Sequence, residues 1–193
     1  QVTGWSRVDI SKLEPIKSLT KRDLISLGID DDQLTVIKNV CETFVRVSPI
    51  NLVVSGCLHK LMNQKKIVQK NEKIAQTFTL PTPLLEMPSM LSWSELSYEQ
   101  KFFLTSFETV LAGEKFVPGI YLILARWPSF LEYVAEQLGP KLKDEKILRR
   151  CKIIADKIFD SSKEILEDID ISNQIPPVDS SQKKNILSAI STY

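Results

Sequence analysis

Apolar side chains recur at helical spacing along most of this chain, and that period constrains its fold more than any other feature. Between residues 34 and 47 the interval is repeatedly three or four, which places these side chains on one face of a helix. They are Leu34, Ile37, Cys41, Phe44 and Val47. Glycine is rare, with 6 residues in 193, and no Asn-Gly or Asp-Gly turn separates alternating apolar runs, as it would in a β-sandwich. The sequence therefore predicts an all-α fold, a helical bundle.

Residues that cap helices mark several expected boundaries. Thr20, followed three residues later by Asp23, is typical of a helix start, and Gly28 is typical of the position just after a helix. Ser97 and Gln100 have the spacing of a capping box. We therefore expect a short helix that ends at Gly28 and another helix that begins at Ser97.

A Ser48-Pro49 step is the expected start of a further helix, because serine caps helices and proline is favoured at their first position. The residues that follow, 50–62, are apolar nearly all round, which indicates a helix buried on most sides. Its small residues, which would allow a neighbouring helix to approach closely, are Ser55, Gly56 and Cys57.

Glycine and proline also mark expected boundaries in the second half of the chain. Gly113 is the expected end of the helix that begins at Ser97, and Gly139-Pro140 is the expected end of a helix that begins at Pro128. The first of these helices would bury an apolar face made of Phe103, Phe107, Val110 and Leu111. The longest amphipathic helix is expected over residues 144–166.

The chain also resembles itself, since residues 30–44 and 179–193 align at a constant offset without a gap. One interpretation is that two related helical repeats form a pseudo-dimer, truncated at one or both ends. The expected divisions are 1–63, the C-terminal part of the first repeat; 64–97, a linker that contains prolines; and 98–193, an incomplete second repeat. The other interpretation is that amphipathic helices in general resemble one another.

Charge and composition exclude several classes of protein. The chain has 25 Lys and Arg against 24 Asp and Glu, a formal net charge of +1, so we do not expect a nucleic-acid binder held by a basic field. The longest apolar run, 116–125, is shorter than the roughly 20 residues that cross a bilayer, and we expect no contact with a membrane. The chain has one histidine and three cysteines, which are too few for a His-rich zinc site or a framework of several disulfides. We therefore expect no metal and no cofactor. We also expect a cytoplasmic location.

One stretch, VPGIYLILARWPSFLE over residues 117–132, resembles the group I (DehI-type) 2-haloacid dehalogenases. Its most specific part is Ala125-Arg126-Trp127-Pro128, and the Ser48-Pro49 step is similar to a helix start in the first repeat of that family. The resemblance covers about residues 30 to 142. It implies an all-α pseudo-dimer, distantly like the alkylhydroperoxidase and carboxymuconolactone decarboxylase group.

The resemblance implies hydrolytic removal of halide from a 2-halocarboxylic acid, with an Asp that activates water and an Asn that positions it. These positions match Ile120 and Ser48, although Asn51, one turn further on, could supply the amide. Because isoleucine cannot accept a proton, weak or no dehalogenation is expected. Arg126 could bind the substrate carboxylate in a bidentate manner, or it could bind carbonyls at a helix end. The candidate substrate-binding residues are Tyr121, Arg126 and Trp127.

The cysteines leave a redox alternative open. Cys57 and His59 are close together, as in thiol peroxidases, but position 60 is Lys60, so the Cys-x-x-Cys pair of those enzymes is missing. Cys41 and Cys57 could meet across two packed helices, or each could be a small buried hydrophobic residue. Cys151, on the apolar stripe of the longest helix, is expected to be a packing residue, and His59 to cap a helix or lie on the surface.

Three functions are therefore carried forward. The first is a dehalogenase-like protein with a pocket between its repeats for a small carboxylic acid, and with a homodimer left open. The second is a non-catalytic helical module that binds a ligand or another protein. The third is a relative of the thiol peroxidases. For the first, the carboxylates that precede Ile120 most closely along the chain are Glu99, Glu108 and Glu114.

Overall fold

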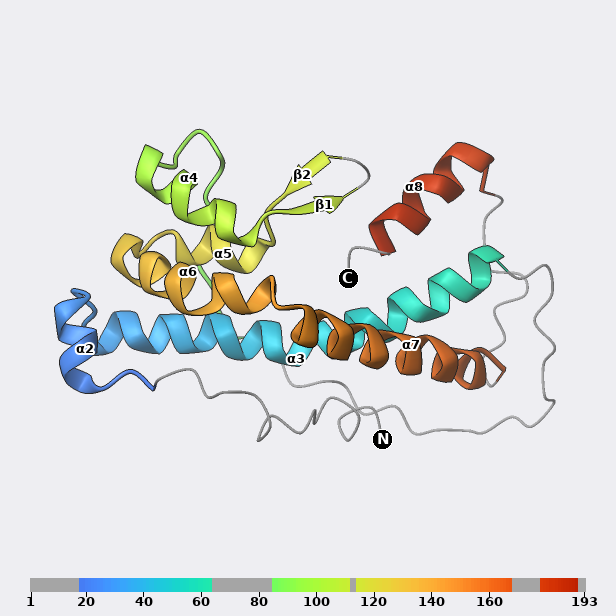
Figure 1. Ribbon diagram of the computed structural model, residues 1–193, viewed down its shortest axis with the longest axis horizontal. Coiled ribbons are helices and arrows are strands. Elements are labelled where there is room, and N and C mark those ends of the chain that lie inside the picture. Colours follow the sequence, from blue (N-terminus) through green and yellow to red (C-terminus); the bar gives the residue numbers. More distant parts are fainter. Residues whose placement is uncertain (1–17, 64–84, 112–113, 168–177, 191–193) are drawn as a thin grey trace. The chain divides into compact units, whose positions relative to one another are not determined.

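Helices contain most of the residues that the computed structural model describes, which are 18–63, 85–111, 114–167 and 178–190. Figure 1 shows α2 (Lys21–Ser26), α3 (Asp31–Asn63), α4 (Tyr98–Leu104), the 3-10 turn η2 (Thr105–Phe107), α5 (Gly119–Leu124), α6 (Pro128–Leu142), α7 (Glu145–Glu167) and α8 (Ser180–Ile190). Two short strands, β1 (Thr109–Leu111) and β2 (Glu114–Phe116), pair with each other. The predicted all-α fold is confirmed, whereas the repeats and their truncation stay predictions.

Contacts within the chain divide it into two compact units. Among the described residues, unit 1 contains 18–49, 85–109 and 115–148, and unit 2 contains 50–63, 110–111, 114, 149–167 and 178–190. These units are not the three successive segments expected from the sequence, so that division stays a prediction. Of the expected linker, residues 64–84 lie outside the described residues, and 85–97 contain neither helix nor strand, as predicted.

Unit 1 is organised around an apolar core to which α3, α4, α5 and α6 contribute. The residues of this core with no exposed surface are Val40, Leu104, Ala125 and Leu131. Helix α6 packs against α4, η2 and α5. Burial of one large apolar side chain contributes about 1.5–3 kcal/mol, so this core fixes α5 and the turn that follows it.

The local caps predicted for unit 1 are confirmed. The Thr20 hydroxyl accepts a hydrogen bond from the Asp23 amide at 3.2 Å, and the Asp23 carboxylate accepts one from the Thr20 amide at 2.8 Å. Gly28 follows α2 with φ +70°, a conformation that glycine adopts without strain. Ser97 and Gln100 form the second predicted capping box at the start of α4.

Pro49 does not begin a helix, and this expectation is wrong. It lies inside α3, which is continuous from Asp31 to Asn63. The Ser48 hydroxyl donates to the carbonyl of Phe44 at 2.7 Å instead of capping a helix start. Proline removes the N–H that would bond to the carbonyl of Val45, and because Val45 is exposed, water can bond to that carbonyl instead. Packing along α3 outweighs the remaining free-energy cost of a proline inside the helix.

Gly139 and Pro140 do not end α6 either, since the helix continues to Leu142. Pro140 lies in the last turn, and the carbonyl that it leaves without a partner belongs to Glu136, an exposed residue. Gly139 is buried, and a Cβ at this position would lie 3.0 Å from Cβ of Ser106 in η2. The glycine therefore allows close packing rather than marking a helix end.

The helix that begins at Ser97 is shorter than expected. Helix α4 ends at Leu104, η2 follows, and β1 and β2 then form a small sheet. Glu108, between η2 and β1, is extended with φ −60° and ψ 133°. Thr109 and Val110 are β-branched and favour strands. Val110, expected on a buried helix face, is exposed, and the expected end at Gly113 lies outside the described residues.

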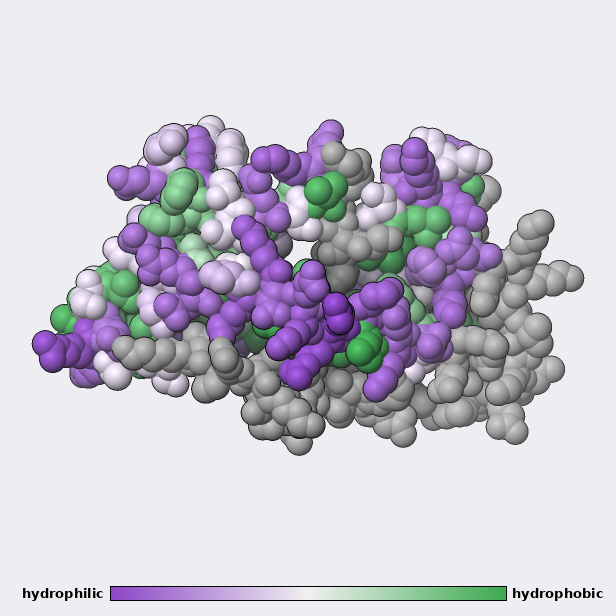
Figure 2. Space-filling model, viewed as in Figure 1, coloured by the Kyte–Doolittle hydropathy of each residue, from purple (hydrophilic) through white to green (hydrophobic). Residues whose placement is uncertain are grey.

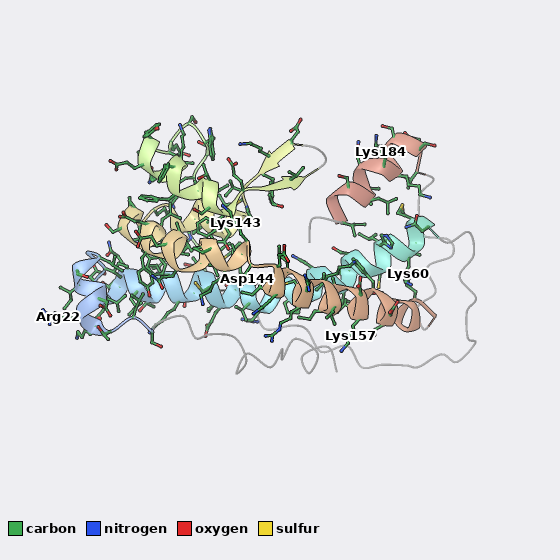
Figure 3. The ribbon with its side chains drawn as sticks, viewed as in Figure 1. Arg22, Lys60, Lys143, Asp144, Lys157 and Lys184 are labelled. Carbon is green, nitrogen blue, oxygen red and sulfur yellow. The ribbon has the colours of Figure 1, made fainter. Side chains whose placement is uncertain are left out.

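In unit 2 the second half of α3 packs against α7 through small residues. Lys60 of α3 and Lys157 of α7 are labelled in Figure 3 and mark these two segments. Gly56 is buried, and a Cβ on it would overlap Oγ of Ser162 and lie 2.8 Å from Cδ1 of Phe159. The close approach predicted from Ser55, Gly56 and Cys57 is confirmed. The His59 ring stacks on Phe159, with centroids 5.4 Å apart, so this histidine is a packing residue and not a cap.

Asp179 caps α8. Its carboxylate accepts a hydrogen bond from the Gln182 amide at 2.8 Å, and the Gln182 side chain accepts one from the Asp179 amide at 3.1 Å. Asp30 and Gln33 make the same reciprocal pair at the start of α3, at 2.7 and 3.1 Å. The two aligned segments thus begin with the same local structure. Ser97 forms such a box outside the alignment, so a shared cap does not establish a repeat.

Candidate functional site: the turn between α5 and α6

Helix α5 and the turn after it carry four of the six residues that the sequence predicts for a site: Ile120, Tyr121, Arg126 and Trp127. Pro118 precedes α5, and Trp127 caps α6 with Pro128 at its first position. Ile120, Tyr121 and Trp127 are half-buried and pack against the core of unit 1, whereas Arg126 is exposed. The stretch that carries the family resemblance therefore forms a tight connection between two helices.

The Tyr121 ring lies flat on the Phe107 ring of η2. The ring centroids are 3.7 Å apart and the ring planes differ by 6°. Burial raises the pKa of the Tyr121 hydroxyl above its ordinary value. At neutral pH this hydroxyl is therefore an uncharged group that can donate a hydrogen bond to a carboxylate but cannot serve as a base.

Hydrogen bonds from Arg126 connect this turn to the segment 85–97, which contains neither helix nor strand. Its Nε donates to the carbonyl of Ser89 at 3.0 Å, and its Nη2 donates to the Ser89 hydroxyl at 2.8 Å. A guanidinium has five N–H groups, so three of them, two on Nη1 and one on Nη2, make no hydrogen bond to any residue that the structure describes. Arg126 is thus held in place and still offers donors to a ligand.

The other two predicted residues lie on α3. Ser48 is exposed, and its hydroxyl is bonded within its own helix. Asn51 is half-buried and belongs to unit 2. The structure therefore places four of the six predicted residues on α5 and the turn that follows, and the other two on a different helix.

No carboxylate is buried among the side chains whose burial the structure describes, although a general base needs surroundings that increase its proton affinity. Glu108 is half-buried, with 22 % of its side chain exposed, and its Oε2 forms an ion pair with Nζ of Lys115 at 3.0 Å. Glu99 and Glu114 are exposed. The position that the resemblance assigns to the catalytic acid, Ile120, has no proton acceptor.

Two of the thiols, Cys41 and Cys57, are half-buried, and both lie on α3, so the alternative that they meet across two packed helices is wrong. They belong to different units. Cys41 packs against the core of unit 1, while Cys57 in unit 2 lies 4.0 Å from the carbonyl of Ser162. Burial raises the pKa of both thiols, more than their hydrogen bonds lower it. A peroxide-reducing cysteine needs the opposite shift, toward the thiolate.

Cys151 is exposed on α7, so the expectation that it is a packing residue is wrong. Among the α7 side chains that the structure describes, the buried ones lie further along the helix, at Ile158, Ser162 and Leu166. Periodicity predicts the face of a helix correctly, but it does not show how far along the helix that face is covered.

This arrangement predicts the order in which the thiols react. At pH 8 iodoacetamide should alkylate Cys151 first, and Cys41 and Cys57 about tenfold more slowly, because alkylation needs an accessible thiolate. Mass spectrometry of peptides sampled over time would give the three rates. In urea the rates should become similar. A Cys57 that reacts as fast as Cys151 in the folded protein would contradict this prediction and favour a redox role.

Sequence reasoning missed two residues of this region, Ser89 and Gln100. The Gln100 side chain completes its capping box and also donates, through Nε2, to the carbonyl of Ala125 at 2.7 Å. The capping pattern indicates the local bond. No local signal predicts a bond to a residue 25 positions away, or the bond from Arg126 to Ser89 over 37 positions.

Metal ligands do not gather in the part of the chain that the structure describes: no three His, Cys, Asp or Glu side chains there are placed to hold an ion. Of the helices in the same residues, none combines the length and the apolar character needed to cross a bilayer. No protein-family model, curated protein or solved structure matches the chain.

Proposed function

We propose that this protein binds small carboxylic acids at the α5–α6 turn and does not hydrolyse them. The observation that supports the proposal is the fixed guanidinium of Arg126, which two hydrogen bonds to Ser89 hold while other N–H groups remain. Paired N–H groups of arginine bind a carboxylate by two parallel hydrogen bonds. Ile120 and Tyr121 supply half-buried apolar surface on the preceding helix.

On this proposal the chain is a dehalogenase-like protein in which Ile120 stands where the water-activating Asp would be. Binding then occurs without the proton acceptor that hydrolysis requires. Slow hydrolytic dehalogenation is a second candidate, favoured by Glu108, a half-buried carboxylate next to the Phe107 ring on which Tyr121 lies. Its ion pair with Lys115 engages one carboxylate oxygen and makes it the weaker candidate.

A thermal shift experiment tests binding. At ten times its dissociation constant, 2-chloropropionate should stabilise the protein by about 1.4 kcal/mol, because a ligand that binds only the folded state shifts the equilibrium by mass action. The shift should disappear in Arg126→Gln. It should persist in the matched variant Ser89→Ala, which keeps the guanidinium and loses only one of its hydrogen bonds. An equal shift with the neutral amide 2-chloropropionamide, or in Arg126→Gln, would contradict the proposal.

Halide release tests the absence of hydrolysis. We expect no chloride above the rate without protein when 2-chloropropionate is incubated with the protein and followed with a chloride electrode. Release that is lost in Glu108→Gln would establish the second candidate. Release that is lost in Asn51→Ala would show that the amide positions a water after all, and either result would overturn the proposal of binding without turnover.

A further inference from the structure

Helix α4 presents large aromatic side chains to solvent. Tyr98 is 85 % exposed and Phe102 is 63 % exposed, and because they are four residues apart they lie on one face of the helix. The opposite face carries Leu104, which is fully buried. Trp93, in the turn before α4, is 50 % exposed. In Figure 2 the surface over α4 carries pale and light-green side chains among purple ones.

A lysine connects Trp93 with the two exposed aromatic residues of α4. The Lys101 ammonium lies over the Trp93 ring, 5.8 Å from its centroid. An ammonium at this distance is attracted to the negative face of the ring. Lys101 and Phe102 follow Tyr98 by three and four residues, so both neighbour Tyr98 on the helix surface, and Lys101 extends that surface to Trp93. We call Trp93, Tyr98, Phe102 and Glu99 the α4 aromatic surface.

Two glutamates, Glu95 and Glu99, belong to this region. The Glu99 side chain is exposed and makes no hydrogen bond or ion pair with any residue that the structure describes. The Glu95 carboxylate accepts hydrogen bonds from the hydroxyl and amide of Ser92, at 2.6 and 2.7 Å, and these bonds lower its pKa. Of the neighbouring cations, Lys101 is engaged with Trp93 and Arg126 with Ser89. A cation from outside the chain can therefore pair with Glu99.

We propose that the α4 aromatic surface is a docking site for a protein segment that bears arginine. A guanidinium can stack on Tyr98 or Phe102 and pair with Glu99, and Lys101 on Trp93 already shows one cation against a ring of this surface. Trp, Tyr and Arg are enriched at the centres of protein interfaces. A nucleic acid fits the surface less well, because its phosphates require cations and Glu99 would repel them.

Binding of fluorescein-labelled hexa-arginine amide, followed by fluorescence anisotropy in low salt, tests the proposal. The double variant Tyr98→Ser/Phe102→Ser keeps every charge and should weaken binding about tenfold, since each ring–cation contact at an exposed site is worth roughly two- to fivefold. Glu99→Gln keeps the rings and should weaken binding about threefold. Matched controls are Ile25→Ser, another exposed apolar residue, and Glu132→Gln, another exposed carboxylate, and each should leave affinity within about twofold.

Two further probes separate arginine recognition from other causes. Hexa-citrulline has the shape of hexa-arginine without its charge and should bind at least about tenfold more weakly. A single-stranded oligonucleotide should not compete. The proposal fails if hexa-arginine does not bind, if the controls weaken binding as much as the surface variants do, or if citrulline or the oligonucleotide binds at the α4 aromatic surface equally well. It does not depend on the carboxylic acid site, since Arg126→Gln should leave hexa-arginine binding unchanged.

Discussion

Replacement of Phe107 by alanine should lower the free energy of unfolding by about 3–5 kcal/mol, the usual cost of removing a buried phenylalanine. Phe107 is only 4 % exposed, and its ring forms the surface on which Tyr121 lies, with centroids 3.7 Å apart. The substitution removes buried apolar area and an aromatic pair worth about 0.5–1.5 kcal/mol in addition. Unit 1 should therefore lose much of its stability beneath the candidate site.

Phe102→Ala is the matched control, because the two phenylalanines are five residues apart and differ chiefly in burial. Phe102 is exposed, and its ring forms an edge-to-face pair with Phe103, so its loss should change stability by less than about 1 kcal/mol. Urea denaturation followed by circular dichroism at 222 nm would measure both variants. Equal losses in the two would mean that Phe107 does not lie beneath Tyr121.

Alkaline titration of Tyr121 gives an independent check on the same substitution. Burial raises the pKa of this phenol, and removal of the Phe107 ring would admit water to it. The pKa of Tyr121 should therefore fall toward its ordinary value in Phe107→Ala, as ultraviolet absorbance of the ionised phenol would show against a Tyr121→Phe background. An unchanged titration would show that the ring does not shield the hydroxyl.

The parts of the fold that could be predicted from the sequence are those that depend on a few consecutive residues. Two capping boxes form as predicted, because both partners of each box lie within one helical turn. They join Thr20 with Asp23 and Ser97 with Gln100. Gly28 ends α2 for the same reason, since φ +70° is a local requirement. These interactions form wherever the helix forms, whatever packs against it.

Helix ends predicted from proline and glycine fail where packing outweighs them. Pro49 and Pro140 both lie inside helices, at places where exposed neighbours allow water to reach the carbonyl that each leaves without a partner. The Gly139-Pro140 pattern predicts a helix end, yet Gly139 is buried against Ser106 and allows close packing. A local pattern cannot distinguish these cases, because the deciding contacts come from residues distant in sequence.

For the candidate site, as for the fold, only those features could be predicted that depend on residues close together in the sequence. The Ala125-Arg126-Trp127-Pro128 stretch indicates where the helix connection lies, and Arg126 is found there. Its partner Ser89 could not be predicted, since their hydrogen bonds join segments that only the folded core of unit 1 brings together. The absence of a proton acceptor at Ile120 is visible in the sequence itself, because it depends only on which residue stands there.

Gly56→Ala should destabilise the protein by about 2 kcal/mol, although alanine favours a helix over glycine by about 1 kcal/mol. A Cβ at position 56 would overlap Oγ of Ser162 and lie 2.8 Å from Cδ1 of Phe159. Ser162 is fully buried and its hydroxyl donates to the carbonyl of Ile158 at 2.8 Å, so it has little freedom to move away. Overpacking of this kind costs about 1–3 kcal/mol and sometimes more, which exceeds the gain in helix propensity.

Gly119→Ala is the matched control, because it also introduces a Cβ beside a close neighbour. That neighbour is Sδ of Met90, 2.6 Å away, at the end of a flexible and largely exposed side chain that can swing aside. The control should change stability by less than about 0.5 kcal/mol. Hydrogen exchange of α7 amides should accelerate only in Gly56→Ala. Adding Ser162→Ala should restore part of the loss, because it removes the overlapping oxygen and leaves the Phe159 contact. No recovery in this double variant would mean that α3 and α7 do not meet at Gly56.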